Sequence, residues 1–247
     1  ARLVVGEEAG GAFMALTGAY RHRVAFSHHY IAQPTARLSA GSNRIRVGLS
    51  IRNLRHAPLE LMYLAHINFR PVDGAVLVDA APDDADHIKI RTTLPGGLVP
   101  SDEHRALIDA VLRDPAAHRR IEPGHRIDPE LVMTLACPAG PDGWAHSMQV
   151  HPDGAADFVS HNPGELDHVV RWISRTGDED ALGLALPGTA GANGYAAEKA
   201  EGNVRILAPQ EEFRCTIEFG ALSLEEARRM RERIEAVRGA GGRPGSA

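Results

Sequence analysis

The sequence predicts an all-β fold, a large antiparallel β-sandwich with a few peripheral helices. Three observations support this fold class. Apolar and polar side chains alternate at period two in residues 43–52 and 213–219, which is the pattern of half-buried antiparallel strands. About a dozen short runs of this kind are separated by turn-forming pairs of Gly, Pro, Asn and Asp. Helical periodicity is confined to two stretches, residues 101–114 and 223–238.

Most of the chain between the turns reads as short strands. In residues 43–52, Ile45, Val47, Leu49 and Ile51 alternate with Arg, Gly and Ser, and residues 213–219 alternate in the same way. Residues 59–69 are largely apolar on both faces of an extended chain, which is typical of a central strand covered on both sides. Further strands are expected over residues 2–6, 12–18, 88–92, 130–136, 147–151, 156–160, 169–174, 181–186 and 203–207.

The two helices are expected to lie outside the sheets. The first carries an apolar stripe and ends before Pro115, which cannot continue a helix without losing a hydrogen bond. The second begins at a capping box made by Ser223 and Glu226, and Gly239 is expected to end it. We therefore expect one β-sandwich domain over residues 1–238 and a disordered Gly-rich tail over residues 239–247.

Composition narrows the class of protein. The formal net charge of -5 and the pI of about 6.2 give no field that favours nucleic acid or a membrane. No apolar run approaches the roughly 18 residues that span a bilayer, and no signal peptide opens the chain, so the cytoplasm is the expected location. Cys137 and Cys215 have no CxxC spacing and are expected as reduced core thiols. The chain starts with Ala1 inside a strand-like run, which indicates either processing or an absent N-terminal part.

Familiar cofactor motifs are absent from the sequence. There is no GxGxxG, P-loop or GxSxG pattern, so neither a nucleotide cofactor nor acyl-enzyme chemistry is expected. The 13 His residues include no HxH or HExxH pair, and a metal site would need a spatial triad such as His66, His151 and His161. We expect no cofactor.

The polar pair His66 and Asn68 is the first candidate site. In an extended strand the two side chains share a face with Met62 and Leu64 and lie about 6.6 Å apart. Polar groups in such an apolar strand need partners or a ligand. An imidazole can act as a general acid and an amide can hold a hydroxyl group. The alternative is a core histidine that a neighbouring side chain satisfies.

Several segments resemble one family. They are PLELMYLAHINF (58–69), HPDG (151–154), DHVVRW (167–172), GLALP (183–187), Gly194-Tyr195, Glu198-Lys199, Gly202-Asn203 and LAP (207–209). This ordered set resembles the aldose 1-epimerase (galactose mutarotase) superfamily, and it is most similar to a bacterial aldose-1-epimerase-like branch. The resemblance implies a β supersandwich with a sugar cleft on one concave sheet. It also implies that the chain interconverts sugar anomers by opening the ring.

The resemblance assigns catalytic roles. A general acid protonates the ring oxygen while a base takes the proton of the anomeric hydroxyl, and His66 would be the acid. The superfamily's Glu falls where this chain has Ala185, so another carboxylate must act as base. Glu198 is the nearest candidate and Asp73 the second. A further substrate-binding His and Arg are expected upstream of the residues present here. A non-catalytic carbohydrate-binding or sensor protein on the same fold is the alternative.

Other polar and aromatic residues are candidates for contacts with the sugar. They are Asn68, Asp73, His151, Asp157, Arg171 and Tyr195. Arg171 lies between Val170 and Trp172 and therefore projects opposite to Trp172, where it either clamps a ligand or pairs with Asp157 or Asp167. Trp172 and Tyr195 either stack on a sugar ring or belong to the core. The expected partner is a small carbohydrate rather than nucleic acid or membrane. A homodimer formed through a sheet edge is the expected oligomer, because dimers are the commonest oligomers.

Overall fold

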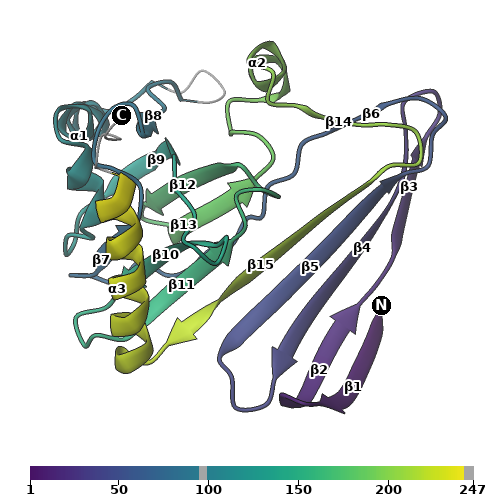
Figure 1. The fold of residues 1–247 in the computed structure, drawn as a ribbon. Coiled ribbons are helices and arrows are strands. Elements are labelled where there is room, and N and C mark those ends of the chain that lie inside the picture. Colours follow the sequence, from purple (N-terminus) through teal and green to yellow (C-terminus); the bar gives the residue numbers. More distant parts are fainter. Residues whose placement is uncertain (95–98, 242–247) are drawn as a thin grey trace, which may run out of the picture.

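The computed structural model describes residues 1–94 and 99–241 (Figure 1). Its largest element is a nine-stranded antiparallel sheet, which we call the large sheet. Its strands follow the order β1 (Arg2–Glu8), β2 (Gly11–Thr17), β4 (His28–Ser39), β5 (Arg44–Asn53), β15 (Glu212–Leu222), β11 (Ala156–His161), β10 (Ala145–Val150) and β7 (Val76–Asp79), and β3 (Tyr20–Val24) pairs with β4.

Two smaller sheets complete the β structure. A four-stranded sheet, which we call the small sheet, has the order β13 (Asp180–Gly188), β12 (His168–Arg175), β9 (Ile127–Leu135) and β8 (Ile88–Ile90). A two-stranded sheet joins β14 (Arg205–Leu207) to β6 (Leu59–Leu61). The helices are α1 (Asp102–Arg113), the 3₁₀ helix η2 (Pro115–Arg119), α2 (Tyr195–Ala200) and α3 (Leu224–Gly241). The predicted antiparallel all-β class is confirmed.

The main core lies between the small sheet and the half of the large sheet that contains β15. Ile51, Phe213 and Ile217 contribute from the large sheet, and Leu131 and Ile173 contribute from the small sheet. The alternation that predicted β5 and β15 therefore places one face of β15 (Phe213, Cys215, Ile217 and Phe219) and the end of β5 (Leu49 and Ile51) in or against this core. The two strands pair with each other directly, with Ile51 opposite Phe213.

The apolar face of the large sheet continues beyond this core. Leu3 and Val5 of β1 lie opposite Leu16 and Met14 of β2 in the antiparallel register, and all four side chains are exposed. In Figure 1 these strands extend away from the small sheet. The two layers therefore overlap over only part of the large sheet.

The helices confirm the capping predictions and correct one boundary. The Ser101 side chain accepts a hydrogen bond from the His104 amide at the start of α1. Ser223 and Glu226 form the predicted capping box, and α3 packs on the outer face of the large sheet (Figure 1). The prediction that Gly239 ends α3 is wrong, because the helix continues to Gly241 and one glycine near a helix end costs only about 1 kcal/mol. The rest of the expected tail, residues 242–247, lies outside the described residues.

The prediction of a continuous central strand over residues 59–69 is also wrong. The strand β6 ends at Leu61, and the chain then runs along the edge of β13 with bridges from Leu64 to Gly188 and from Phe69 to Leu182. An antiparallel ladder needs equal steps on both strands, but 69 − 64 is five residues and 188 − 182 is six. A regular ladder therefore cannot join the two bridges.

Candidate functional site

Trp172 lies at the centre of the outer face of the small sheet. Strand β12 alternates, so Val170 and Trp172 point outward while Ile173 points into the main core. Val132 lies opposite Trp172 on β9, and together with Val170 and Leu186 it forms an apolar floor. Trp172 is only half-buried, so part of its indole ring is open to a ligand.

His66 lies against this indole ring. The ring centroids are 5.5 Å apart and the planes meet at 66°, an edge-to-face arrangement. The backbone explains the placement, because the amide of Ile67 donates to the carbonyl of Ala65 at 3.2 Å and closes a γ-turn centred on His66. His66 and Asn68 are both exposed, whereas Ala65 between the bridges is buried. His66 is therefore not a core histidine.

Glu130 completes the arrangement on the other side of Trp172. The indole Nε1 donates to Glu130 Oε2 at 2.6 Å, and the guanidinium of Arg91 pairs with the other carboxylate oxygen. Sequence reasoning missed both Glu130 and Arg91. We call His66, Trp172, Glu130 and Arg91 the His66–Arg91 row, because these side chains follow one another across the outer face of the small sheet.

A cleft of about 420 Å³ adjoins this row. Arg91, Val132 and Thr134 line it from the sheet, and Gly191 and Asn193 line it from the loop that precedes α2. Ligand-binding clefts usually measure roughly 300–1,000 Å³, so the cleft suits a small molecule. The row and this cleft, which we call the first cleft, form the candidate site.

Glu198, the predicted base, organises the loop beside the cleft. Its carboxylate accepts hydrogen bonds from the amides of Gly191 at 2.9 Å and Asn193 at 3.0 Å, and from the Asn203 side chain at 2.8 Å. Burial alone raises the pKa of Glu198, but these hydrogen bonds, led by that of Asn203, bring it below its usual value. The side chain is fully buried. Glu198 therefore stays ionised as an anchor of the loop.

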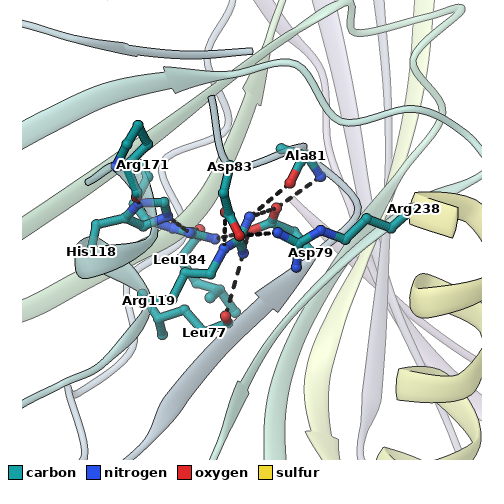
Figure 2. A network of polar contacts seen from close by, with 10 residues as sticks. Leu77, Asp79, Ala81, Asp83, His118, Arg119, Arg171, Leu184 and Arg238 are labelled. Atoms are coloured by element: carbon teal, nitrogen blue, oxygen red, sulfur yellow. Dashed lines mark hydrogen bonds and ion pairs between the residues drawn. The ribbon is translucent and has the colours of Figure 1, made fainter. Parts of the chain in front are cut away.

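Arg171 projects opposite to Trp172, as predicted, but into the interior rather than a cleft. Figure 2 shows it beside His118 and Asp79. It is completely buried, and it donates to the Leu184 carbonyl at 2.9 Å, to His118 Nε2 at 2.8 Å and to Asp79 Oδ2 at 2.9 Å. Its carboxylate partner is therefore Asp79, and the expected pairing with Asp157 or Asp167 is not formed. A clamp on a ligand at the outer face is excluded by this orientation.

Asp79 is the centre of this buried network. Arg119 also pairs with it, with Nη1 at 2.9 Å, so one carboxylate lies between two guanidinium groups. Burial raises the pKa of Asp79, but Arg171 and Arg119 outweigh this effect and hold the pKa at about 2. Burial and the same two arginines lower the pKa of His118 to about 3, so its ring is neutral. The network ties β7 of the large sheet to β12 of the small sheet.

The other predicted contact residues are held elsewhere. His151 pairs with Asp157 at 3.0 Å, where β10 ends and β11 begins. Asp73 pairs with Arg175 at 3.0 Å beyond the end of β12. Tyr195 lies exposed on α2, and Asn68 is exposed two residues after His66. Among the described residues, no hydrogen bond or ion pair joins Asp73, His151 or Asp157 to His66. Ala185 lies fully buried in the main core, where a carboxylate would have no solvent.

Two further expectations concern metals and thiols. Within residues 1–94 and 99–241, no three His, Cys, Asp or Glu side chains gather closely enough to hold a metal ion, so the triad of His66, His151 and His161 does not form. Cys137 and Cys215 are free buried thiols, as predicted. Over the same described part of the chain, no helix has the length and apolar character needed to cross a membrane.

Solved structures share this fold. A candidate aldose 1-epimerase from Klebsiella pneumoniae superposes with a TM-score of 0.79 at 13% sequence identity, over 96% of this chain and 58% of that protein. A galactose mutarotase-like protein from Clostridium acetobutylicum gives a TM-score of 0.57 at 15% identity, over 89% and 66% of the two chains. A candidate aldose 1-epimerase from Escherichia coli K12 gives 0.52 at 16% identity, over 90% and 68%.

These similarities establish the fold as galactose mutarotase-like, in agreement with the resemblance found in the sequence. The chain spans less than three fifths of the Klebsiella protein. No protein-family model and no curated protein matches the chain.

Proposed function

We propose that the outer face of the small sheet binds a sugar at the His66–Arg91 row and in the first cleft. The observation that carries the proposal is the exposed His66 ring, whose centroid lies 5.5 Å from that of the half-buried Trp172 indole in an edge-to-face arrangement. An aromatic ring offers an apolar surface to the C–H face of a pyranose. Imidazole and carboxylate groups at the edges of that ring supply directional hydrogen bonds to hydroxyl groups.

The same groups can support anomer interconversion. His66 would protonate the ring oxygen and Glu130 would accept the proton of the anomeric hydroxyl, which breaks the ring C1–O bond and leaves an open-chain aldehyde. We assign the base to Glu130 rather than Glu198, because Glu198 is fully buried and already accepts three hydrogen bonds. Trp172 separates His66 from Glu130 and contacts both, so a sugar stacked on its ring would lie between acid and base.

One observation favours a binding protein without turnover. Each carboxylate oxygen of Glu130 already has a partner, Arg91 for Oε1 and Trp172 for Oε2, so either oxygen must give up a hydrogen bond before it can take a proton from a sugar. A non-catalytic carbohydrate-binding or sensor protein on this fold is therefore the second candidate function.

The experiment compares binding with turnover on a panel of aldoses. Sugar binding is measured by NMR titration and anomerisation by polarimetry. His66→Ala should abolish binding or turnover and change the free energy of unfolding by at most about 1–2 kcal/mol, because the side chain is exposed. His87→Ala is the matched control, since His87 is a surface histidine that pairs with Asp84 and belongs neither to the His66–Arg91 row nor to the lining of the first cleft.

The Glu130→Gln variant separates the two functions. If Glu130 is the base, this variant should keep sugar binding and lose a factor of roughly 10² to 10⁴ in turnover. A wild type that binds sugars but turns over none supports the binding protein. A His66→Ala variant that binds sugars normally would refute the site itself.

A further inference from the structure

Strand β1 forms one edge of the large sheet. It pairs with β2 along its full length, and within the described part of the chain no strand pairs with its other side (Figure 1). An edge strand presents a row of free backbone N–H and C=O groups, to which another chain can add. Proteins commonly protect such edges with a proline or a bulge. Strand β1 contains no proline, and its ladder with β2 runs without a bulge.

The backbone groups of Leu3, Val5 and Glu7 point to this open edge. Along a strand, the N–H and C=O groups alternate between the two neighbouring strands. The amide of Ala40 donates to the carbonyl of Ala12 at 2.8 Å, so the even-numbered residues of β2 bond towards β4 and its odd-numbered residues bond towards β1. The odd-numbered residues of β2 lie opposite the even-numbered residues of β1. Leu3, Val5 and Glu7 therefore keep their backbone groups for another chain.

The sequence of β1 is complementary to itself. In an antiparallel pair of β1 strands with a two-fold axis at Val5, Val5 lies opposite its own copy and Leu3 lies opposite the partner's Glu7. These residues carry the free backbone groups, and each such pair can exchange two hydrogen bonds. The same axis places Arg2 opposite the partner's Glu8, at a position where opposed side chains lie close together. A shift of two residues in either direction loses this charge pair and leaves part of β1 unpaired.

The side chains favour the pairing on both faces of the sheet. On one face, Leu3 and Val5 are 64% and 71% exposed and continue the exposed apolar row of β2. Pairing places the two Val5 side chains in contact and removes apolar surface from water. On the other face, the guanidinium of Arg37 donates to both carboxylate oxygens of Glu8. This contact orders the carboxylate that Arg2 of the partner subunit would reach.

The edge at β3 lacks this complementarity. Strand β3 pairs with β4 and has the sequence Tyr-Arg-His-Arg-Val, with exposed side chains at Arg21 and Arg23. A pair of β3 strands centred on His22 would place these two arginines opposite each other, and like charges that are directly opposed destabilise a sheet. Charge therefore protects β3 from self-association, whereas the charges of β1 favour it.

We propose that two copies of this chain form a two-fold symmetric dimer by pairing their β1 strands in antiparallel orientation about Val5. The two large sheets then continue into one another, and the interface contacts the same surface on both subunits, as in most homodimers. The inference goes beyond the proposed function and does not depend on it, because β1 contributes no residue to the His66–Arg91 row or to the lining of the first cleft.

Sedimentation velocity over a series of protein concentrations tests the dimer. The wild-type chain should shift from monomer to dimer as its concentration rises. Val5→Pro should remove the dimer, because proline has no N–H group to donate at the two-fold axis. The Val5 amide points away from β2, so this variant should keep the circular dichroism spectrum and most of the thermal stability of the wild type.

Charge variants test the register of the pairing. Arg2→Glu places two carboxylates opposite each other on each side of the axis, and Glu8→Arg likewise places two guanidinium groups together. Each variant should raise the Kd of its own dimer by about tenfold or more. An equal mixture of the two variants should recover the dimer, because both charge pairs of the mixed dimer are again opposite in sign. Arg21→Glu is the matched control, since it makes the same change at an exposed arginine of β3.

The outcomes decide the inference. A wild type that stays monomeric at every concentration would overturn it, and so would a dimer that Val5→Pro leaves intact. Equal weakening by Arg2→Glu and Arg21→Glu, or a mixture of Arg2→Glu with Glu8→Arg that stays monomeric, would overturn the proposed register. Recovery of the dimer in that mixture would support it, because mixing cannot repair a folding defect in either variant.

Discussion

Removing the charge of Asp79 should be among the most destabilising single changes in this protein. Asp79→Asn keeps the size of the side chain but places an amide beside two buried guanidinium groups, those of Arg119 and Arg171. Arg171 has no solvent to compensate for the loss, because its side chain is completely buried. The backbone amide of Ala81, which donates to Asp79 Oδ1 at 3.0 Å, keeps only a neutral acceptor.

Two arguments give the magnitude. Lowering the pKa of Asp79 from 3.8 to about 2 corresponds to roughly 2.5 kcal/mol of stabilisation of the ionised form. Removing one partner of a buried ion pair typically costs about 3–5 kcal/mol, because the remaining charge stays buried. We therefore expect Asp79→Asn to lower the free energy of unfolding by about 3–5 kcal/mol, a large fraction of the roughly 5–15 kcal/mol that stabilises a protein.

Equilibrium unfolding in urea, followed by tryptophan fluorescence and circular dichroism, measures the effect. Asp83→Asn is the matched control, because Asp83 also pairs with Arg119 but its side chain is 26% exposed, so a loss below about 1 kcal/mol is expected. The double variant Asp79→Asn/Arg171→Met should lose less than the sum of the two single variants, since the residues interact directly. A loss for Asp79→Asn no larger than that for Asp83→Asn would refute the reasoning.

Two further predictions concern pH and the position of His66. Burial lowers the pKa of His118 from 6.5 to about 3 and that of His161 from 6.5 to about 4, so both rings are neutral in the folded protein. Their contribution to the free energy of unfolding is complete above pH 6.5. Below pH 6.5 it is lost at roughly 1.4 kcal/mol per pH unit for each histidine. The urea concentration at the midpoint of unfolding should therefore be lower at pH 5 than at pH 7. Equal midpoint concentrations at the two pH values would contradict this prediction. Gly188→Ala should weaken sugar binding, because its Cβ would lie 2.7 Å from the Tyr63 carbonyl oxygen and displace the segment that carries His66. Gly177→Ala, which meets nothing within 4 Å, is its control, and normal binding by Gly188→Ala would count against the site.

Local patterns were sufficient for most of the fold. Strands β5 and β15 were predictable because one face of each packs in the core and the other does not, which imposes period two on the sequence. Strands β3 and β4 were missed, because β3 is mostly polar, and because Pro34 and the small residues Ala32 and Ala36 on the apolar face of β4 weaken its alternation. Of these two strands, only Tyr30 and Ala32 of β4 pack against the main core, so burial places little constraint on the rest of their sequence.

The candidate site was only partly predictable. His66 was identifiable from its motif, and the alternation around Trp172 correctly placed Arg171 on the opposite face. The partner Asp79 was not predictable, because it is 92 residues away and the contact depends on how the two sheets stack. Glu130 carried a usable signal, since it alternates with Leu131 on β9 and therefore shares a face with Val132. Its contact with Trp172 still required the register between β9 and β12.

The failure of the strand prediction at residues 59–69 explains how a histidine of an apolar segment reaches the surface. In a regular strand paired with β13, the alternation of side chains between the two faces of the sheet would alone have decided whether His66 is buried or exposed. Between the bridges at Leu64 and Phe69 the chain has one residue fewer than β13, and the γ-turn at His66 lies within this mismatch. Irregular pairing at a strand edge gives up ladder hydrogen bonds, and such irregularities are common next to functional sites because they redirect a side chain. Here the mismatch brings His66 against Trp172, so the irregular segment and the sheet residue together form a surface that neither sequence segment specifies alone.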